Sequence, residues 1–535
     1  MTTSTTNSRA PGWRDLLSGN NGWRSLALAG GVALHATNVY VATTVLPSIV
    51  KDIGGLDLYS WNTTLFVVAS ILGSVFAAQM LSALGPRVAY VMALVGFSAG
   101  TILCAAAPNM AWMLGGRTLQ GFGGGILLAS SYALIRIVFA PPLWSRAMGL
   151  VSGMWGVATL CGPAVGGVFA QFGHWRWAFW SLLPIVAGLG LIIRAQVPAG
   201  RAVSSADGTS RTHDDAHAVP WFKVVLLCAS AVAISLGAVV SSHVLAVIWM
   251  LLGLLLAWWL AQRERSVRHA LPRLMPTGAY SLRTRLGALY AVMSLLGLAT
   301  TSEIYIPYFL QTIHGQTPFA AGYLAALMAA GWSAGSMTSA ARHGESAERR
   351  VRLGPVIVAL GMFALAWLLP QASLFASAAG LAAICIALFG VGVGVGIGWP
   401  HLLTRAMTAV RPGEQGLASA SITTVQLYSM ALGSALAGLV ANSAGLAGGG
   451  LADVQRASVW LFALFALAPA GAAVIVLRGR TAASPSGQDV KLEMRQQVTM
   501  EARKEARKEA KHEASRRGSR EGQENEMNAS HPVTE

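Results

Sequence analysis

The sequence predicts an all-α polytopic membrane protein with fourteen transmembrane helices in groups of six, two and six. The 535 residues are 54% hydrophobic and 11% charged, whereas a typical soluble protein has about 25% charged residues. Apolar runs of about 20 residues can cross a ~30 Å hydrocarbon core as helices, and such runs recur from residue 25 to residue 477. The segments between these runs are short and polar, as expected for connections between spans.

The apolar runs divide the chain into seven regions. A cytoplasmic N-terminal tail (1–24) precedes the first six spans, which are 25–50, 61–81, 89–107, 110–139, 147–169 and 177–195, in a bundle over 25–196. A polar loop (197–220) leads to two extra spans, 221–240 and 244–261, in the region 221–262. After a basic loop (263–285), the last six spans are 286–310, 319–341, 353–369, 374–403, 416–441 and 459–477, within 286–478. The charged tail 479–535 follows.

The distribution of basic residues predicts the orientation. Lys and Arg accumulate in short cytoplasmic connections. With a cytoplasmic N-terminus, the outer side holds only Lys51, Arg176 and Arg456. The inner side holds a much larger number of basic residues, from Arg87 to Arg411, and both tails add more, whereas Arg117 lies inside the fourth span. Both termini are therefore expected in the cytoplasm. In the tail, the repeat E-A-R-K-E-A-R-K-E-A-K-H-E has a helix-supporting charge spacing but no apolar face, which predicts a solvated helix.

Composition also argues against nucleic-acid binding and against metal or cofactor sites. The formal net charge is +16, but the basic residues lie in connections and tails and do not form one stripe with aromatic residues, so no nucleic-acid partner is expected. The four cysteines, Cys104, Cys161, Cys228 and Cys385, all lie within apolar runs, without a close pair or a histidine cluster. We expect no metal site and no cofactor.

Glu303 is the most informative single residue. It is the only carboxylate within a predicted span, in Thr300-Thr-Ser-Glu-Ile-Tyr-Ile-Pro-Tyr-Phe-Leu-Gln311. An ionisable side chain at the bilayer centre costs about 3 kcal/mol or more, so such residues usually belong to a transport pathway or a proton relay. The alternative is a neutral or paired Glu that only joins two helices. Without a second carboxylate or an activated nucleophile, an intramembrane enzyme is the weakest candidate.

Glycine-rich motifs predict close helix packing. Gly121 and Gly125, Gly162 and Gly166, and the series Gly390, Gly394 and Gly398 have small-xxx-small spacing. Pro163 removes a backbone hydrogen bond inside the fifth span and predicts a bending point there. Arg117 and Gln120, three residues apart in the fourth span, share one helix face.

Four motifs resemble those of the major facilitator superfamily, and within it the fourteen-span drug:proton antiporters. R-x-x-Q-G matches at Arg117, Gln120 and Gly121, and the antiporter-type motif G-P-x-x-G-G matches at Gly162, Pro163, Gly166 and Gly167. W-R-W-x-F matches at Trp175, Arg176, Trp177 and Phe179, and Y-x-P-x-x-L-Q matches at Tyr305, Pro307, Leu310 and Gln311. The resemblance covers residues 25–477.

The resemblance implies two six-helix bundles around a central cavity, with alternating access by rocking of one bundle against the other. It implies proton-coupled export of small amphipathic compounds across a bacterial cytoplasmic (inner) membrane, with protons, a small-molecule substrate and the bilayer as partners. A periplasmic adaptor is left open as a further partner, and otherwise a monomer is expected. Uptake or facilitated diffusion of a metabolite is the alternative within transport, and a non-transporting scaffold or sensor that signals through its tail is the alternative outside it.

The chain departs from this family at two places. Many relatives have an Asp nine residues before a Pro in the first span, whereas this chain has Asn38 before Pro47. The loop between the second and third spans keeps only Gly85 and Arg87 of its usual pattern. Position 38 therefore lacks a titratable group, which supports the alternative of uptake or facilitated transport. If protons are coupled, Glu303 is the only carboxylate within the predicted spans that can carry them.

Other polar residues are candidates for the substrate cavity. They are Asn38, Gln120, Tyr305, Tyr308, Gln311, His401 and Gln426. For His35, His401, Gln311 and Gln426, the alternative is that the side chain forms a hydrogen bond to a neighbouring helix and takes no part in proton transfer. Glu303 and Arg117 lie about eight and about seven residues from the outer ends of their helices, which places both ~10 to 12 Å deep. We predict that Arg117 tunes the proton affinity of Glu303 when the two meet across the cavity.

Overall fold

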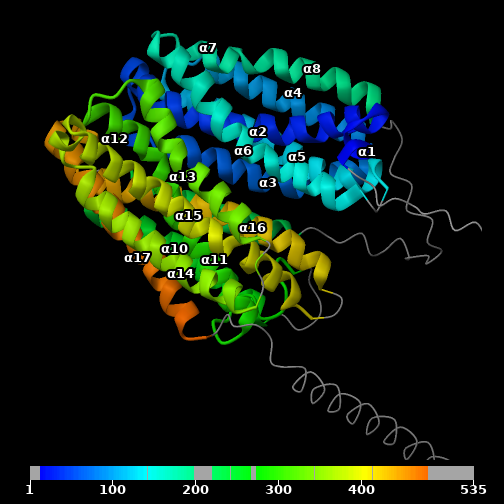
Figure 1. Cartoon of the computed structure of the whole chain (residues 1–535). Coiled ribbons are helices and arrows are strands. Elements are labelled where there is room, and N and C mark those ends of the chain that lie inside the picture. The colour runs from blue at the N-terminus through cyan, green and yellow to red at the C-terminus, as the bar shows by residue number, and fades with distance from the viewer. Residues whose placement is uncertain are drawn as a thin grey trace, which may run out of the picture. The chain divides into compact units, whose positions relative to one another are not determined.

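A computed structural model describes residues 13–140, 143–197, 220–240, 242–266, 273–340, 342, 344–411 and 414–479 (Figure 1). These residues form helices and connections, with no β-strand among them. The first part comprises α1 (Trp13–Leu17), α2 (Gly19–Ile53), η1 (Leu56–Leu58), α3 (Trp61–Leu84), α4 (Pro86–Ala105), α5 (Met110–Val138), α6 (Trp144–Gln171), α7 (Trp175–Trp180) and α8 (Leu182–Gln196). Next come α9 (Trp221–Gly237) and α10 (His243–Ser266).

The second part comprises α11 (Arg285–Thr300), η3 (Thr301–Tyr305), α12 (Ile306–Thr312), α13 (Pro318–Ser339), α14 (Glu345–Leu368), η4 (Ala372–Ala376), α15 (Ala378–Thr408), α16 (Gln415–Ser443), η5 (Leu446–Gly448) and α17 (Leu451–Leu477). Helix α2 begins six residues earlier than the predicted span. Its first turns are held there because the Ser25 hydroxyl donates to the Leu16 carbonyl, 2.9 Å away. Most of the predicted loop 197–220 and of the charged tail 479–535 lies outside the described residues.

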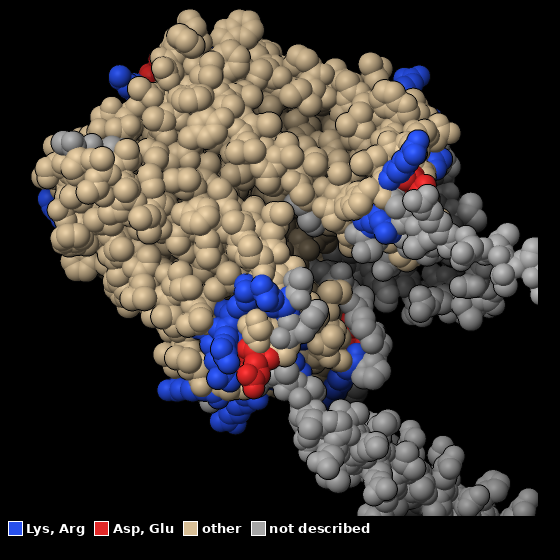
Figure 2. Space-filling model, in the orientation of Figure 1, with Lys and Arg blue, Asp and Glu red and all other residues tan. Residues whose placement is uncertain are grey.

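Twelve helical segments among the described residues are long and apolar enough to cross a membrane. The other two predicted spans are also helices: α9 is apolar but has 17 residues, and the glycine and serine residues of α13 lower its hydropathy. The face seen in Figure 2 has a wide surface without Lys, Arg, Asp or Glu. The Lys and Arg side chains gather toward the edges of this face. An uncharged band of this kind is what a hydrocarbon layer requires.

We call α1 to α8 the first half and α11 to α17 the second half. Within each half, glycines allow the backbones of neighbouring helices to come into contact. In the first half, α5 packs between α3 and α4, and a Cβ on Gly121 would lie 2.2 Å from the Phe66 carbonyl oxygen. In the second half, α15 packs against α13 and α14. There the close approaches are made by Gly392 and Gly396 toward α13 and by Gly394 toward α14, whereas Gly390 has open space around it. Of the predicted series at 390, 394 and 398, close approach is confirmed at Gly394 and is wrong for Gly390 and Gly398, because α15 packs between two neighbours and uses glycines on two faces.

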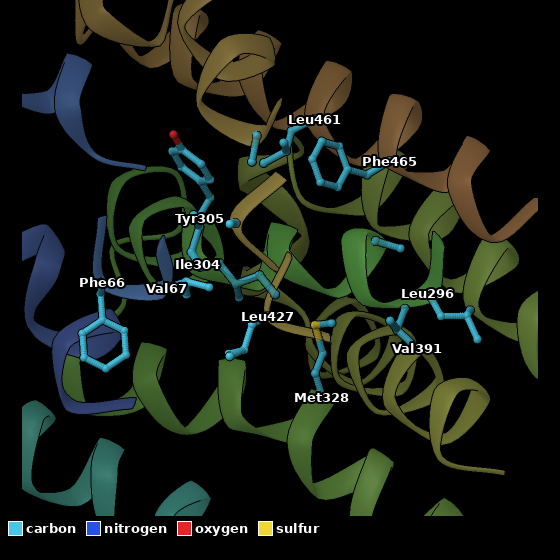
Figure 3. Close-up of a cluster of buried hydrophobic side chains, with 14 of the residues drawn as sticks. Phe66, Val67, Leu296, Ile304, Tyr305, Met328, Val391, Leu427, Leu461 and Phe465 are labelled. Atoms are coloured by element: carbon cyan, nitrogen blue, oxygen red, sulfur yellow. The ribbon is translucent and has the colours of Figure 1, made fainter. Parts of the chain in front are cut away.

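Buried apolar side chains form two separate cores. One lies entirely within residues 16–197. The other joins the second half and α9 to residues 41–71, 104–114 and 170–179 of the first half. Figure 3 shows Phe66 and Val67 of α3 in this second core, together with Ile304 and Tyr305. The two halves therefore share a core at one end, where α2 finishes and α3 begins, and we call this the Tyr59 end.

Hydrogen bonds between the halves follow the same division. Those at the Tyr59 end are Tyr59 to the Ile304 carbonyl (3.1 Å), Thr64 to Ser434 (3.0 Å), Ser434 to the Ser60 carbonyl (3.0 Å) and Asn442 to the Asp57 carbonyl (2.7 Å). A further bond, from Tyr323 to the Leu160 carbonyl, joins α13 to the middle of α6. We call the opposite end, where α10 finishes and α11 begins, the Arg265 end. Among the described residues, the first half keeps its own core there and makes no side-chain hydrogen bond to the second half.

Candidate functional site

Glu303 lies in a break in its helix. The sequence predicts one continuous span over 286–310, but the structure has α11, the 3₁₀ segment η3 and the short helix α12 in its place. Glu303 is at the centre of η3 and is half-buried. Irregular backbone at membrane depth is tolerated where it is covered by protein or lines a cavity, and broken helices are a recurring feature of transporter sites.

Local sequence explains the break. The hydroxyls of Thr300, Thr301 and Ser302 donate to backbone carbonyls three residues earlier, at 2.6 to 3.0 Å. Such bonds compete with the regular α-helical ladder. Four residues after Glu303, Pro307 has no N–H to donate to the Glu303 carbonyl, which instead accepts from the Ile306 N–H in a 3₁₀ pattern. Pro307, which belongs to the Y-x-P-x-x-L-Q motif, and the three hydroxyl residues before Glu303 therefore unwind the helix at the carboxylate.

The carboxylate of Glu303 has no ionic partner in the part of the chain that the structure describes. Within the described residues it forms no ion pair and no hydrogen bond. Tyr40, on α2 of the first half, is close enough to interact with it electrostatically. Two residues further along the chain, Tyr305 stacks on Tyr59 of the first half with ring centroids 4.8 Å apart, and Tyr308 contacts Tyr59 edge-on at 5.5 Å. Glu303 thus lies where the two halves meet.

Arg117 is at the centre of a polar network in the first half. It is 2% exposed, and its Nη1 donates to Gln120 Oε1 at 2.9 Å while its Nε donates to the Asn62 carbonyl at 3.3 Å. Its guanidinium lies over the Phe66 ring at 4.1 Å. Gln120 Nε2 in turn donates to Asn38 Oδ1 (3.2 Å) and to Thr101 (2.9 Å). The predicted shared face of Arg117 and Gln120 is confirmed.

This network contains no carboxylate among the described residues. Asn38 occupies the place of the usual Asp and accepts from Gln120, and the Nδ2 groups of Asn38 and Asn62 are buried without a hydrogen-bond partner. His35 packs between Phe66 (5.3 Å) and Trp155 (6.2 Å). Arg117 and Glu303 form no ion pair with each other in this arrangement of the halves. Their predicted contact would need a different arrangement.

The antiporter-type motif on α6 packs against both α2 and α13. A Cβ on Gly162 would lie 2.3 Å from the Tyr40 Cβ, and one on Gly166 would lie 3.0 Å from the Val41 carbonyl. On the other side, a Cβ on Gly167 would lie 2.7 Å from the Phe319 Cα, and one on Gly322 would lie 3.3 Å from Pro163. Helix α6 continues through Pro163. The motif therefore brings the first half into direct backbone contact with the second, and Gly162 packs against Tyr40, which interacts electrostatically with Glu303.

The remaining candidate residues are spread along the second half. Gln311 on α12 has a buried Nε2 without a hydrogen-bond partner. His401 on α15 is bonded through Nε2 to Ser339 of α13, 2.9 Å away. Gln426 on α16 is half-buried. These three residues lie on three different helices, α12, α15 and α16.

Several contacts could not be anticipated from the sequence. Tyr40 and Tyr59 carry no motif signal, and their positions depend on the packing of α2 and α3 against the second half. Asp52 accepts hydrogen bonds from Trp175 (3.1 Å) and Arg176 (2.7 Å), which connects the W-R-W motif to the end of α2. Lys223 of α9 and Glu264 of α10 form a buried ion pair. Glu264 is a buried carboxylate near the end of an apolar helix, beyond the end of the predicted span 244–261.

Comparisons with known proteins agree with this architecture. The family profile described as Major Facilitator Superfamily matches residues 28–434. The chain belongs to the Major Facilitator Superfamily. A protein of Mycobacterium tuberculosis named as a probable multidrug-efflux transporter is 38% identical over 442 residues, which are 82% of this chain and 91% of that protein. Multidrug resistance protein 3 of Bacillus subtilis is 24% identical over 78% of each chain.

Solved structures show the same fold. A bacterial homologue of the human lysosomal transporter Spinster, in an inward-facing and unoccupied conformation, superimposes with a TM-score of 0.59 at 16% identity, over 87% of this chain and 99% of that one. An auto-inhibited peptide transporter of the POT family gives 0.57 at 14% identity, over 85% of this chain and 97% of that one. Together with the family match and the 38% identical relative, the fold identifies the chain as a multi-pass membrane transporter and not an enzyme.

Proposed function

We propose that this transporter exports small amphipathic compounds from the cytoplasm in exchange for protons, and that Glu303 carries the proton. The observation that carries the proposal is the position of Glu303. Its carboxylate has no ion-pair partner among the described residues, and it lies in a helix break at the contact between two halves that must separate during alternating access. A carboxylate at such a contact changes its surroundings when the halves move, and a change of surroundings changes its proton affinity. That is the physical requirement for coupling proton movement to a conformational cycle.

The direction of transport rests on the relatives. The Mycobacterium tuberculosis protein, 38% identical, and the Bacillus subtilis protein, 24% identical, are named for multidrug efflux and multidrug resistance. The spans carry few charges, which suits apolar or weakly cationic substrates better than polyanions. In this proposal the substrate pathway includes Asn38, Gln120, Tyr305, Tyr308, Gln311, His401 and Gln426. Arg117 changes the proton affinity of Glu303 when the two halves take the other arrangement of the alternating-access cycle.

We further propose fourteen crossings, in which α9 and α13 join the twelve apolar segments. Helix α9 is about 26 Å long at 1.5 Å per residue, and α13 has 22 residues, so both can cross. Fourteen crossings leave both termini on one side. The Arg265 end carries Arg263, Arg265, Arg273, Arg283, Arg285, Arg349, Arg350, Arg352 and Arg405. By the positive-inside rule this end faces the cytoplasm, and the Tyr59 end faces outward.

A flux measurement tests the proposal directly. The purified protein would be reconstituted in vesicles with an imposed pH gradient and a fluorescent amphipathic cation as the substrate. We expect accumulation against the substrate gradient, into the more acidic compartment, and loss of accumulation when a proton ionophore is added. Downhill movement that is unaffected by the ionophore would overturn proton coupling and support the alternative of facilitated transport or uptake.

The scaffold or sensor alternative makes a different prediction. If the charged tail carries the activity, deletion of residues 488–535 should abolish it. The proposed transporter should keep its pH-driven accumulation after the same deletion, because the residues that carry the proposal lie between residue 38 and residue 426.

A further inference from the structure

A pocket of about 450 Å³ lies at the Arg265 end, between the end of α10 and the segment that leads into α11. Its lining residues among those described are Arg265, Ser281, Leu282 and Arg283. The pocket is remote from Glu303, which lies in the η3 break beyond the far end of α11. It is not used by the proposed transport mechanism.

One arginine of the pocket is held in place by the backbone. The Nε of Arg265 donates to the Tyr280 carbonyl at 3.1 Å, and its Nη2 donates to the same oxygen. A guanidinium has five N–H donors in a fixed fork, so the bond to Tyr280 fixes the direction of the group and leaves further donors for a ligand. Arg283 is exposed beside it.

The nearby carboxylates are already used by other groups. Glu264 pairs with Lys223, and it also accepts from the backbone N–H groups of Leu274 (3.3 Å) and Met275 (3.4 Å). Glu414 accepts from the Thr277 hydroxyl at 2.6 Å. Within the described part of the chain, no carboxylate forms an ion pair with Arg265 or Arg283. The pocket therefore keeps a net positive charge and is complementary to an anion.

The surface that leads into the pocket is apolar. Helix α10 packs against α9, and its exposed apolar side chains include Leu251, Leu254, Leu255 and Trp258, which are 45 to 57% exposed. An apolar helix exposed to this extent faces lipid acyl chains. Near its end, Arg263 lies over the Trp259 ring at 4.9 Å, a pair typical of the membrane interface. Leu282 adds a 46% exposed apolar side chain at the pocket itself.

We propose that this pocket binds the phosphate-bearing headgroup of an anionic phospholipid, with an acyl chain along the outer face of α10. Arginine donors bind phosphate oxygens in a bidentate manner, and the Ser281 hydroxyl supplies another donor. Basic pockets between membrane helices at the positive end of a protein are suited to such headgroups. Free inorganic phosphate has the same chemistry, but the adjoining lipid-facing surface favours a lipid.

Retention of lipid by the purified full-length protein tests the site. Native mass spectrometry would compare phosphatidylglycerol with phosphatidylcholine, which has the phosphodiester but no net charge. We expect preferential retention of phosphatidylglycerol, weakened about fivefold by Arg265→Gln or Arg283→Gln and roughly 25-fold by the double variant, at about one kcal/mol per arginine near the surface. Arg349→Gln is the matched control, because Arg349 is an exposed arginine at the same end, paired with Glu345 at 3.5 Å.

Equal retention of the two lipids, or unchanged retention in the double variant, would overturn the proposal. The thermal unfolding temperature in lipid-free detergent must match that of the unmodified protein, so that a folding defect is not counted as lost binding. Inorganic phosphate is added as a separate arm: protection by phosphate alone, together with displacement of phosphatidylglycerol, would assign the pocket to a soluble anion. The readout is lipid binding, so a negative result leaves the transport proposal untouched.

Discussion

The Tyr59 hydroxyl donates to the Ile304 carbonyl, 3.1 Å away, across the contact between the two halves. Ile304 follows Glu303 in the irregular segment, and Tyr59 also stacks on Tyr305, the next residue. A side chain of the first half therefore braces the backbone on which the candidate proton carrier sits. Opening of the Tyr59 end must break this bond, so the closure of that end and the geometry around Glu303 are linked through two residues.

Tyr59→Phe removes this hydrogen bond and keeps the aromatic stacking. Loss of one such bond costs about 1 kcal/mol, and more where a buried carbonyl is left unsatisfied. We expect a lower unfolding temperature, together with faster labelling of a cysteine placed at Ser60, which is buried at the Tyr59 end. Tyr323→Phe is the control, because its hydroxyl donates to the Leu160 carbonyl from an exposed position. An equal effect of both variants would contradict a special role for Tyr59.

Gly167→Ala should disturb the contact between α6 and α13. The new Cβ would lie 2.7 Å from the Phe319 Cα, which is backbone and cannot move without shifting its helix. We expect lower stability and slower transport. Gly156→Ala, on the same helix, has open space around it, so it should stabilise the protein by about 0.5 to 1 kcal/mol through helix propensity. Thermal unfolding of the two variants side by side measures the difference, and the packing argument fails if both shift in the same direction.

The Lys223–Glu264 pair gives a prediction about energetic coupling. Removing one partner of a buried pair costs about 3 to 5 kcal/mol, because a charge is left without compensation. Lys223→Met and Glu264→Leu should each destabilise the protein by this order, and Glu264→Leu also leaves the N–H groups of Leu274 and Met275 without their acceptor. The double variant should recover part of the loss. Denaturation of the three variants measures the coupling, and a double variant as unstable as the sum of the single ones would show that the two residues are not coupled.

The sequence predicts the helices well because each is a run of apolar residues, and the membrane fixes the length that a run must have. All fourteen predicted runs are helical. The break at Glu303 was missed because Thr300, Thr301 and Ser302 are tolerated in apolar helices and only their bonds to carbonyls three residues back reveal the unwinding. The sequence contains these three hydroxyl residues, but their effect on the backbone depends on which carbonyl oxygens their hydroxyls donate to.

The sequence identifies several residues of the candidate site, but it does not predict which of them contact one another in the structure. Motifs identified Arg117, Gln120 and the α6 glycines, since each motif is local. Tyr40 and Tyr59 reach the site through contacts between segments more than 200 residues apart in sequence, as the bond between Tyr59 and Ile304 shows with a separation of 245. Equal depth in the membrane made a contact between Arg117 and Glu303 geometrically possible, but depth contains no information on which way each helix turns its side chains.

Glu303→Gln is the decisive variant for the proposed coupling. Glutamine has nearly the same size and can still form hydrogen bonds, but it cannot bind and release a proton. Since Glu303 makes no ion pair or hydrogen bond with the described residues, the substitution should leave expression and thermal stability nearly unchanged. In vesicles with an imposed pH gradient, we expect the accumulation of substrate to fall until its concentrations on the two sides are equal. Exchange of labelled for unlabelled substrate, which needs no net proton movement, should continue.

The control for this variant is Glu345→Gln, because Glu345 is an exposed acid at the Arg265 end, with a side chain that is 91% exposed. It should retain full accumulation. If Glu303→Gln still drives uphill transport with an unchanged pH dependence, the proton must pass through another group, and His35 is then the first to test, because it lies buried in the first half near Arg117. If exchange is lost together with accumulation, Glu303 is needed for substrate movement itself, and its role is not confined to the proton.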